Sequence, residues 1–485
     1  MLIDMRSQLL LTCNNPQITN EIKANLVKTN PDFLRLKKMG YPTHDISPTI
    51  KMYEDSGKGV LAPRCSLEMI RQVCAKHNER IVVKDNRTVS REIQVGLKDI
   101  QLFWYQEEAV NVMNKNQHGL IVAPCGSGKS IIGIAFIAKM KKPTMVIVHT
   151  LELFKQWEDE IKKHLYHEGE LGRIGGGQRS LGNITIAMIQ TLVKLSDKEW
   201  NAINNTFEII IGDEAHHFGA ESYMKIMKRN TAKYSLGLTA TPKRRDGKNF
   251  IVSNYLGKVI YEITDRDLSV MGRSLSCQVR MVNTECKYNF TKLNENLAVL
   301  NTIIAKDTNR NNTIVSCIQQ DVEDNRTIIV LTDRVIQGRL LNATLKSKGF
   351  QTDIIIGTIS SDVRANIKNR MKTGNLQILI ANKQIAAEGL DIPNIDSVHI
   401  CFWTSNSSLI KQMIGRGRRA TDDKDHCRVW FYTDKIMSVE IDETTFAEKL
   451  VEVPGFKHST NRIRQWFLTQ NFDVKSYDKY GEETM

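Results

Sequence analysis

The loop APCGSGKS, residues 123–130, connects the apolar segment HGLIVA with the helical segment IIGIAFIAKM. A glycine-rich loop between a strand and a helix can direct backbone N–H groups and the positive end of the helix dipole at phosphate groups. Lys129 would then reach the β- and γ-phosphates of a nucleotide, and Ser130 would bind Mg²⁺. A chance glycine-rich turn is the alternative, and the strand-loop-helix context disfavours it. The sequence therefore predicts that ATP and Mg²⁺ are held by Pro124, Cys125, Gly126, Ser127, Gly128, Lys129 and Ser130.

Two adjacent acids end the apolar segment FEIIIGDE, residues 207–214. Open parallel sheets bind ligands beyond the carboxyl ends of their strands. We expect Asp213 to hold Mg²⁺, directly or through water, and Glu214 to orient and deprotonate an attacking water. Adjacent acids are also common in solvated turns, but the buried strand and the upstream loop favour catalysis. The following His216 is predicted to couple hydrolysis to other events, and His217 to be structural.

The segment QMIGRGRR, residues 412–419, carries three arginines and lies far downstream of the nucleotide loop. By itself it could be the basic end of a helix that binds a phosphate backbone or faces solvent. With a nucleotide bound elsewhere in the chain, Arg416 and Arg419 could instead stabilise charge that develops on the γ-phosphate, with Gln412 alongside. Hydrolysis would then depend on a second domain.

Two series of strands and helices are expected to position these residues, because short apolar runs alternate with amphipathic stretches. The first series of strands is predicted at 118–123, 144–149, 184–189, 207–213 and 234–240, and the second at 327–332, 352–357, 376–381, 396–402 and 427–433. Residues 256 to about 290 look irregular or antiparallel. A helix is predicted over 361–372, with Ser361 as its N-cap. Residues 23–40 are expected to form a helix or a helix pair.

This alternation predicts two α/β domains within a chain of 485 residues. We expect an amino-terminal accessory domain at 1–90, a first α/β domain at 91–260, a linker at 261–290, a second α/β domain at 291–455 and a tail at 456–485. The net charge of +13 favours a polyanionic partner. Nine cysteines without C-x-x-C spacing argue against a disulfide framework or a zinc site, and the sequence shows no signal peptide or membrane span. These features predict a cytoplasmic protein.

Taken together and in this order, the nucleotide loop, DEAH (213–216), TAT (239–241) and QxxGRxxR (412–419) resemble the motifs of superfamily two helicases over about residues 97–435. The resemblance implies an α/β fold of two tandem RecA-like parallel-sheet domains with a small α+β accessory domain. Within it, LFWYQ (102–106) resembles the Q motif, which implies that Gln106 reads adenine. AAEGLDIP (386–393) resembles motif V. The remaining implied roles are coupling at His216, Thr239 and Thr241 and a place in the interdomain cleft for Gly389 and Asp391.

Several segments are similar to the XPB and phage UvsW branch of that superfamily, among them GRIGGG (172–177) and GLTATPKRRDG (237–247). Residues 144–157 resemble motif Ia and residues 186–192 motif Ib, both of which grip a nucleic-acid backbone in the family. The nucleic-acid contacts implied in this way are Gln190, Thr191, Arg244 and Arg245. Where XPB-type enzymes carry R-E-D, this chain has Arg245-Asp246-Gly247.

The resemblance implies an ATP-dependent DNA helicase or translocase that acts on duplex or branched DNA largely without regard to sequence, in a bacterial or phage-infected cell. An RNA helicase of the DEAH type and the motor subunit of a restriction or defence complex are alternatives, as is a clamp that ATP switches without turnover. Residues 30–65 are similar to the amino-terminal module of the phage-type members. This module is expected to bind DNA, with Arg35, Lys37 and Lys38 on a helix, or else to be a scaffold that packs on the first motor domain.

Overall fold

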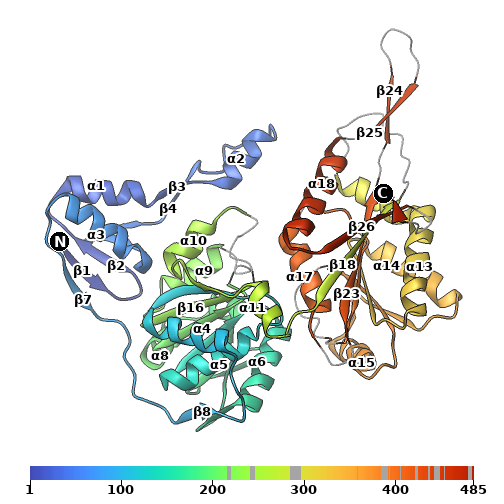
Figure 1. Cartoon of the computed structure of the whole chain (residues 1–485). Helices are drawn as coiled ribbons and strands as arrows, with labels where there is room; N and C mark the ends of the chain where they lie inside the picture. Colours follow the sequence, from blue (N-terminus) through green and yellow to red (C-terminus); the bar gives the residue numbers. More distant parts are fainter. Residues whose placement is uncertain are drawn as a thin grey trace. The chain divides into compact units, whose positions relative to one another are not determined.

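The computed structural model describes residues 1–215, 220–240, 246–284, 297–357, 359–383, 392, 394–404, 406–420, 424–434, 437–441, 448–452, 454–478 and 483–484. The chain folds into two compact units, Met1–Thr264 and Asp265–Met485. In Figure 1 the first unit runs from blue to green and the second from yellow-green to red. Within the described ranges, no helix combines the length and the apolar character needed to cross a membrane.

The amino-terminal domain is a five-stranded sheet with two helices packed on it (Figure 1). The strand order is β5 (Glu54–Ser56), β6 (Gly59–Ala62), β2 (Leu9–Thr12), β1 (Leu2–Met5) and β7 (Val82–Asp85), and the helices are α1 (Pro16–Asn25) and α3 (Leu67–Lys76), the latter preceded by η1 (Arg64–Ser66). A separate strand pair, β3 (Val27–Thr29) and β4 (Thr49–Lys51), carries α2 (Pro31–Lys38). The segment 23–40 thus contains the end of one helix and the whole of another, separated by a short strand.

The rest of the first unit is an eight-stranded sheet that is parallel except at one edge. Its order is β13 (Gln178–Ser180), β12 (Gly172–Gly175), β14 (Ile184–Met188), β10 (Thr144–Val148), β15 (Ile209–Asp213), β16 (Tyr234–Thr239), β9 (His118–Val122) and β17 (Val259–Glu262). A second small pair joins β8 (Val95–Leu97) to β11 (Leu165–His167). The five strands predicted for this region are confirmed, because each apolar run is a buried parallel strand.

Helices cover both faces of this sheet (Figure 1). One face is covered by α4 (Trp104–Lys115), α5 (Lys129–Met140) and α6 (Leu151–His164), and the other by α7 (Ile189–Leu192), α8 (Asp197–Thr206), α9 (Ala220–Met227) and α10 (Asn249–Tyr255). Strands buried on both faces read as continuous apolar runs rather than as alternating patterns. The sequence shows such runs at the central strands of this sheet.

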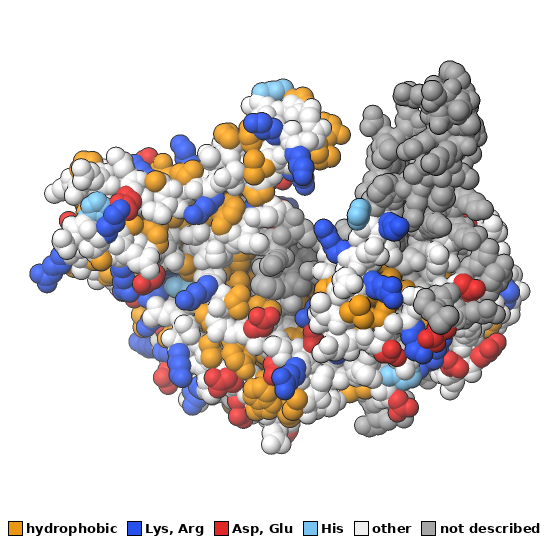
Figure 2. Space-filling view, turned by 45° about the horizontal axis from the view of Figure 1, so that its top comes forward, with side chains coloured by type: hydrophobic (Ala, Val, Ile, Leu, Met, Phe, Trp, Pro, Cys, Tyr) orange, Lys and Arg blue, Asp and Glu red, His pale blue; other side chains and the backbone are white. Residues whose placement is uncertain are grey.

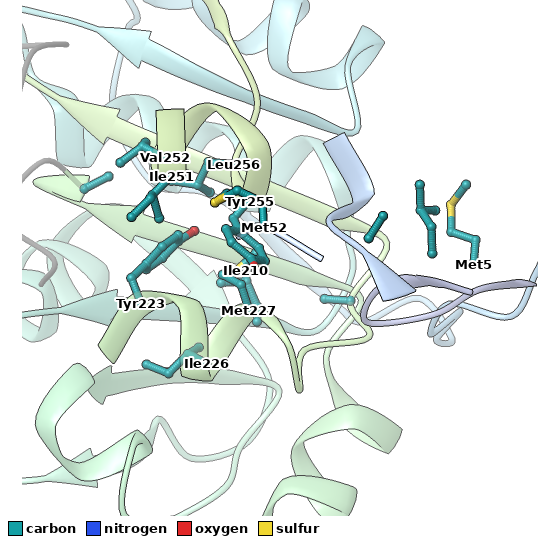
Figure 3. Close-up of a cluster of buried hydrophobic side chains, with 14 of the residues drawn as sticks. Met5, Met52, Ile210, Tyr223, Ile226, Met227, Ile251, Val252, Tyr255 and Leu256 are labelled. Atoms are coloured by element: carbon teal, nitrogen blue, oxygen red, sulfur yellow. The ribbon is translucent and has the colours of Figure 1, made fainter. Parts of the chain in front are cut away.

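The amino-terminal domain shares a continuous apolar core with this second face. Met52, which follows β4, is 3% exposed and belongs to the same buried cluster as Tyr223 of α9 and Tyr255 of α10 (Figure 3). Arg64 adds a buried polar anchor, because its guanidinium donates to the Ala232 carbonyl at 2.5 Å and to Ser235 Oγ at 2.8 Å. The body of the domain is therefore an integral part of the first unit.

Deletion of residues 1–90 is expected to produce aggregated or unfolded protein. The deletion would expose a set of large apolar side chains that includes Tyr223, Ile226 and Tyr255, and burial of each such side chain contributes about 1.5–3 kcal/mol. Light scattering and thermal unfolding of the truncated chain measure this directly. Arg64→Ala, which removes the polar anchor alone, should lower the unfolding temperature without aggregation. A monomeric truncated protein that unfolds at the wild-type temperature would contradict the shared core.

The second unit is built on another eight-stranded sheet, parallel except for its last pair. Its order is β20 (Thr352–Ile355), β21 (Ile378–Asn382), β19 (Ile328–Thr332), β22 (Ser397–Ile400), β23 (His426–Asp434), β18 (Ser276–Thr284), β26 (Asp473–Tyr477) and β27 (Glu483–Thr484). The faces and ends carry α11 (Asp265–Val270), α12 (Leu297–Lys306), α13 (Thr308–Glu323), α14 (Val335–Ser347), α15 (Ser361–Lys372), α17 (Ser407–Gly417) and α18 (Pro454–Thr469), and β24 (Met437–Ile441) pairs with β25 (Glu448–Glu452). The second predicted series of strands is confirmed, and with it the α/β class.

Three expectations for this unit were wrong. Residues 276–284, expected to be irregular or antiparallel and part of a linker, form the nine-residue strand β18, which is parallel to β23 and β26. Residues after 455, expected to be a tail, continue α18 and form β26, which pairs with β18. The N-cap of α15 is Ser360, one residue before the predicted Ser361, because the Ser360 hydroxyl accepts from the Val363 N–H. For β18 and β26 the sequence does not show which strands they will join, and that pairing makes them part of the sheet.

Candidate functional site

The nucleotide loop has the backbone that phosphate binding requires. Gly126 and Gly128 have φ values of +87° and +78°, a region that side chains other than glycine rarely occupy. Gly128 is also the N-cap of α5, so the loop leads directly into a helix N-terminus. Ser127 is fully buried and its hydroxyl donates to the Pro124 carbonyl at 2.7 Å, which closes the turn. Backbone N–H groups and a helix N-terminus at one place form an anion-binding site.

Gln106 of α4 holds this loop in place through hydrogen bonds. Its Nε2 donates to the Ser127 carbonyl at 2.9 Å, and its Oε1 accepts from the Phe103 N–H at 3.0 Å. A Cβ at Gly128 would lie 2.5 Å from Gln106 Nε2, so glycine is needed there for the close approach. Gln106 is 4% exposed and positions the loop in this structure, and adenine reading by Gln106 stays a prediction.

Lys129 and Glu214 form an ion pair at the carboxyl end of the sheet. Lys129 Nζ lies 3.3 Å from Glu214 Oε1, and both side chains are largely buried. Burial opposes the charge of Lys129, but the neighbouring Glu214, Cys125 and Asp213 outweigh it and raise the pKa of this amine. Glu214 Oε2 also accepts from the Ala240 N–H at 3.4 Å, and the Glu214 backbone has a φ of +48°. The site therefore holds a cation and a candidate base in direct contact.

Asp213 is held beside this pair by an indole. Trp157 Nε1 donates to Asp213 Oδ2 at 2.8 Å, and the Glu214 N–H donates to Asp213 Oδ1 at 2.9 Å. Burial, followed by the charge of Glu214, raises the pKa of Asp213 to about 6. A buried carboxylate of this kind is stabilised by a positive charge placed next to it.

Trp157 connects three functional segments of the first unit. It belongs to α6, which begins after Thr150 at the end of β10, and its ring packs against α5 so closely that a Cβ at Gly133 would lie 2.6 Å from it. The sequence offered no reason to single out this residue, because a tryptophan at helical spacing is usually a core residue. Its role becomes visible only from the hydrogen bond to Asp213.

Trp157→Phe is expected to lower ATP turnover about tenfold and to raise the Mg²⁺ concentration that gives half-maximal activity. Phenylalanine keeps most of the ring packing but removes one of the two buried hydrogen bonds of Asp213. Loss of such a hydrogen bond costs about 1–3 kcal/mol of stabilisation. ATPase activity measured against Mg²⁺ concentration tests this.

Trp200→Phe is the matched control, because Trp200 Nε1 is also buried but donates to the Leu192 carbonyl, at 3.3 Å. It should lower stability without changing the Mg²⁺ dependence. Identical Mg²⁺ profiles for both variants would show that Trp157 is only a packing residue.

The segments that resemble motifs Ia and Ib also end at this edge of the sheet. Thr150 caps α6 by accepting from the Leu153 N–H at 3.2 Å. Gln190 and Thr191 lie in the short helix α7 after β14, and Gln190 Nε2 donates to the His149 carbonyl at 2.7 Å. Gln190 is exposed and Thr191 half-buried. Both are placed where they could meet a ligand that crosses the ends of β10 and β14.

The arginine segment occupies the end of α17 in the second unit. Asn406 caps this helix by accepting from the Leu409 N–H at 3.2 Å, and Gln412 lies within it, half-buried. Arg419 follows the helix and is bridged through its backbone to Ser274. The backbone of Arg416 is helical, and its side chain lies outside the described residues.

Arg418, between them, has a structural role. Its Nε donates to the Leu275 carbonyl at 3.0 Å, one of its terminal nitrogens lies 3.6 Å from an Asp265 carboxylate oxygen, and its guanidinium covers the Phe472 ring. At Gly417 a Cβ would lie 2.7 Å from Cys427 Sγ, so only glycine lets the helix end approach β23. In the arginine segment, Gly417 and Arg418 are therefore packing residues, and the other predicted positions stay candidates for function.

Of the other predicted site residues, Thr239 is buried at the end of β16. The predictions for His216, Thr241, Arg244, Arg245, Gly389 and Asp391 fall outside the described residues.

The fold and the site define a class of protein: an ATP-using enzyme with two RecA-like parallel-sheet units, a phosphate-binding loop and an acid pair at the adjoining strand end. Residues 99–244 match the family described as type III restriction enzyme, res subunit, and residues 309–421 match the helicase conserved C-terminal domain. These matches support a superfamily two helicase that resembles the XPB and UvsW branch. The chain is accordingly an ATP-hydrolysing helicase that binds nucleic acid.

Two curated relatives illustrate this branch. The chain is 25% identical over 385 residues to the DNA 3'-5' translocase XPB2 of Sulfurisphaera tokodaii, covering 71% of this chain and 84% of the relative. It is 22% identical over 392 residues to the ATP-dependent DNA helicase uvsW of Enterobacteria phage T4, covering 77% of each. Among solved structures, the fragment of a putative HsdR subunit of a type I restriction enzyme from Vibrio vulnificus shares the fold, with a TM-score of 0.55 at 16% identity over 79% of this chain and 70% of that one.

Proposed function

We propose that the chain couples ATP hydrolysis to movement on, or remodelling of, duplex or branched DNA. The observation that carries this proposal is the site where Lys129, Asp213 and Glu214 meet at one sheet edge, to which Thr150 and Gln190 of the segments that resemble motifs Ia and Ib also belong. Because the ATP site adjoins residues proposed to contact a nucleic-acid backbone, hydrolysis could change how tightly a strand is bound. The relatives named as a DNA translocase and a DNA helicase support DNA as the substrate.

Mg²⁺ fits the residues at this site. Asp213 is buried, 3% exposed, and its two hydrogen bonds leave carboxylate lone pairs for a cation. We propose that Asp213 and Ser130 hold Mg²⁺ together with the nucleotide phosphates. Bound there, the ion would neutralise charge on the phosphates.

The residues of the chain would divide the chemical work as follows. The loop N–H groups and Lys129 bind the phosphates, which draws Lys129 away from Glu214. Glu214, positioned by the Ala240 N–H, would then orient a water molecule and take its proton. Arg416 and Arg419 would stabilise the charge that develops at the γ-phosphate, with Gln412 alongside. Gly389 and Asp391 are proposed to line the nucleotide cleft, and His216, Thr239 and Thr241 to couple hydrolysis to movement.

ATPase assays with single-stranded DNA, linear duplex, a forked duplex and RNA test the proposal. We expect forked or linear duplex DNA to stimulate hydrolysis most, with little dependence on base sequence and a steep decrease in salt, because the contacts are to phosphates. Arg244 and Arg245 are proposed to join Gln190 and Thr191 among these contacts. Glu214→Gln serves as the inactive control. Stimulation by RNA above every DNA would overturn the DNA assignment.

An RNA helicase is the second candidate. The chain is 26% identical over 380 residues to the putative ATP-dependent RNA helicase L396 of Acanthamoeba polyphaga mimivirus, a similarity close to that of the DNA translocase. The RNA arm of the same assay distinguishes the two candidates. We further propose a reducing, cytoplasmic setting in a bacterial or phage-infected cell, in keeping with eight free cysteines among the described residues.

A further inference from the structure

An outlying lobe of the amino-terminal domain exposes apolar side chains. This α2 lobe, residues 27–51, consists of β3, α2, the following loop and β4, and it extends away from the five-stranded sheet (Figure 1). No side chain of α2 is buried. Leu34, in the middle of α2, is 53% exposed, and Met39 and Tyr41, which follow the helix, are 61% and 56% exposed. Apolar and basic side chains lie next to each other on the surface of the lobe (Figure 2).

Hydrogen bonds hold both ends of α2, although none of its side chains is buried. Asn30 caps α2 by accepting from the Asp32 N–H at 3.1 Å, and its Nδ2 donates to the Ser47 carbonyl at 2.9 Å. At the other end Gly40 has a φ of +73° and the Tyr41 N–H donates to the Leu36 carbonyl at 3.0 Å, which closes the helix with a tight turn. Hydrogen bonds therefore hold the backbone at both ends of α2.

The base of α2 is anchored to the ATP-binding part of the first unit. Asp32 Oδ2 lies 2.7 Å from Lys248 Nζ, and a Cβ at Gly247 would lie 3.2 Å from the Pro31 ring. Residues 246–248 follow β16, whose end adjoins Glu214 through the Ala240 N–H. The lobe is therefore tied to residues that follow, in sequence, the strand whose end adjoins Glu214.

The charge of the lobe favours a polyanion. Residues 27–51 contain five lysines and arginines against two acids, a net charge of +3. One of the acids, Asp32, is already engaged by Lys248 and by Arg35 at 3.0 Å. Lys37 and Lys38 are exposed beside Leu34 on the same helix. A phosphate backbone matches the cations, and an unstacked base or a terminal base pair matches the apolar tip.

We propose that the tip of α2 is a separating element that lies against the end base pair at a fork. In this arrangement Leu34, Met39 and Tyr41 contact the bases while Lys37 and Lys38 hold the flanking phosphates. The anchor at Lys248 keeps the tip in place while the motor draws one strand past it. This inference rests on the proposed function, since it requires a nucleic-acid substrate with a junction between paired and unpaired strands.

The apolar contribution is tested with the full-length triple variant Leu34→Ala, Met39→Ala, Tyr41→Ala. The positions are exposed, so folding should be unaffected, which circular dichroism and thermal unfolding check. We expect ATPase stimulated by linear single-stranded DNA to stay within twofold of wild type, while strand separation on a forked duplex falls by about tenfold or more. Val89→Ala, at a position 73% exposed in the same unit, is the matched control. Unchanged strand separation in the triple variant would overturn the proposal.

The charge contribution is tested with Lys37→Ala, Lys38→Ala. This double variant should weaken binding to forked DNA and reduce the dependence of log affinity on log salt concentration by about two. Lys58→Ala, Lys84→Ala removes two exposed lysines elsewhere in the amino-terminal domain and should leave fork binding and its salt slope as in wild type. Equal effects of the two pairs would contradict a phosphate-binding lobe. Failure of any DNA to stimulate wild-type ATPase would instead refute the proposed function, so the two failures are distinguishable.

Discussion

Lys129→Ala is expected to abolish ATP binding and hydrolysis, whereas Glu214→Gln is expected to keep ATP binding and lose turnover by about 10²–10⁴-fold. Lys129 is the cation at the start of α5 that we propose to bind the phosphates, so its loss would remove their main charge partner. Glutamine keeps the size and hydrogen-bonding shape of Glu214 but cannot take a proton. Because Lys129 Nζ is 3.3 Å from Glu214 Oε1, removal of the carboxylate also frees Lys129 for the phosphates.

Fluorescent nucleotide binding and steady-state ATPase measurements separate these effects. Glu214→Gln should bind ATP at least as tightly as wild type, and Lys129→Ala should show no saturable binding. Cys125→Ala is a useful control, since it shortens a side chain in the same loop and leaves the backbone N–H groups and Lys129 in place. Equal loss of nucleotide affinity in both main variants would contradict the division of roles between Lys129 and Glu214.

The sequence was most informative where one physical requirement dominates. Strands buried on both faces must be continuously apolar, and this requirement located β9, β10, β14, β15 and β16 within one or two residues. A phosphate-binding loop must combine glycines with a lysine at fixed spacing, so Lys129 could be assigned from its motif. The pairing of Lys129 with Glu214 follows from the parallel order β15-β16-β9, which brings the ends of those strands to one edge.

Other features depend on contacts that no local pattern records. β18 was missed because its alternating segment SCQVRMVNT does not show which strands it will join, and in the fold it lies between β23 and β26. From the sequence Trp157 resembles an ordinary core residue, and only the structure shows that its indole N–H donates to Asp213. The amino-terminal domain was expected to bind DNA or to be a scaffold. Its body shares the apolar core of the first unit, as the scaffold alternative requires, while α2 is left exposed as a binding surface would be.

The largest test of the second unit concerns its arginines. Arg416→Ala and Arg419→Ala are each expected to reduce turnover by about 10³-fold while lowering ground-state ATP affinity much less, because they act on charge that develops in the transition state. Arg418→Ala is the matched control within the same helix end. Its guanidinium is engaged by the Leu275 carbonyl, Asp265 and Phe472, so this variant should lower the unfolding temperature and leave the rate per folded molecule unchanged.

Single-turnover hydrolysis with saturating ATP and DNA distinguishes the possible roles of the arginine segment. If Arg416 and Arg419 act on the γ-phosphate, their variants lose the chemical step but keep DNA affinity, and Lys129 still binds nucleotide. If the segment is instead a basic helix end that binds a phosphate backbone, both variants will hydrolyse ATP normally at saturating DNA but need more DNA to reach that rate. The second outcome would remove the arginines from catalysis and leave the hydrolytic site with residues of the first unit alone.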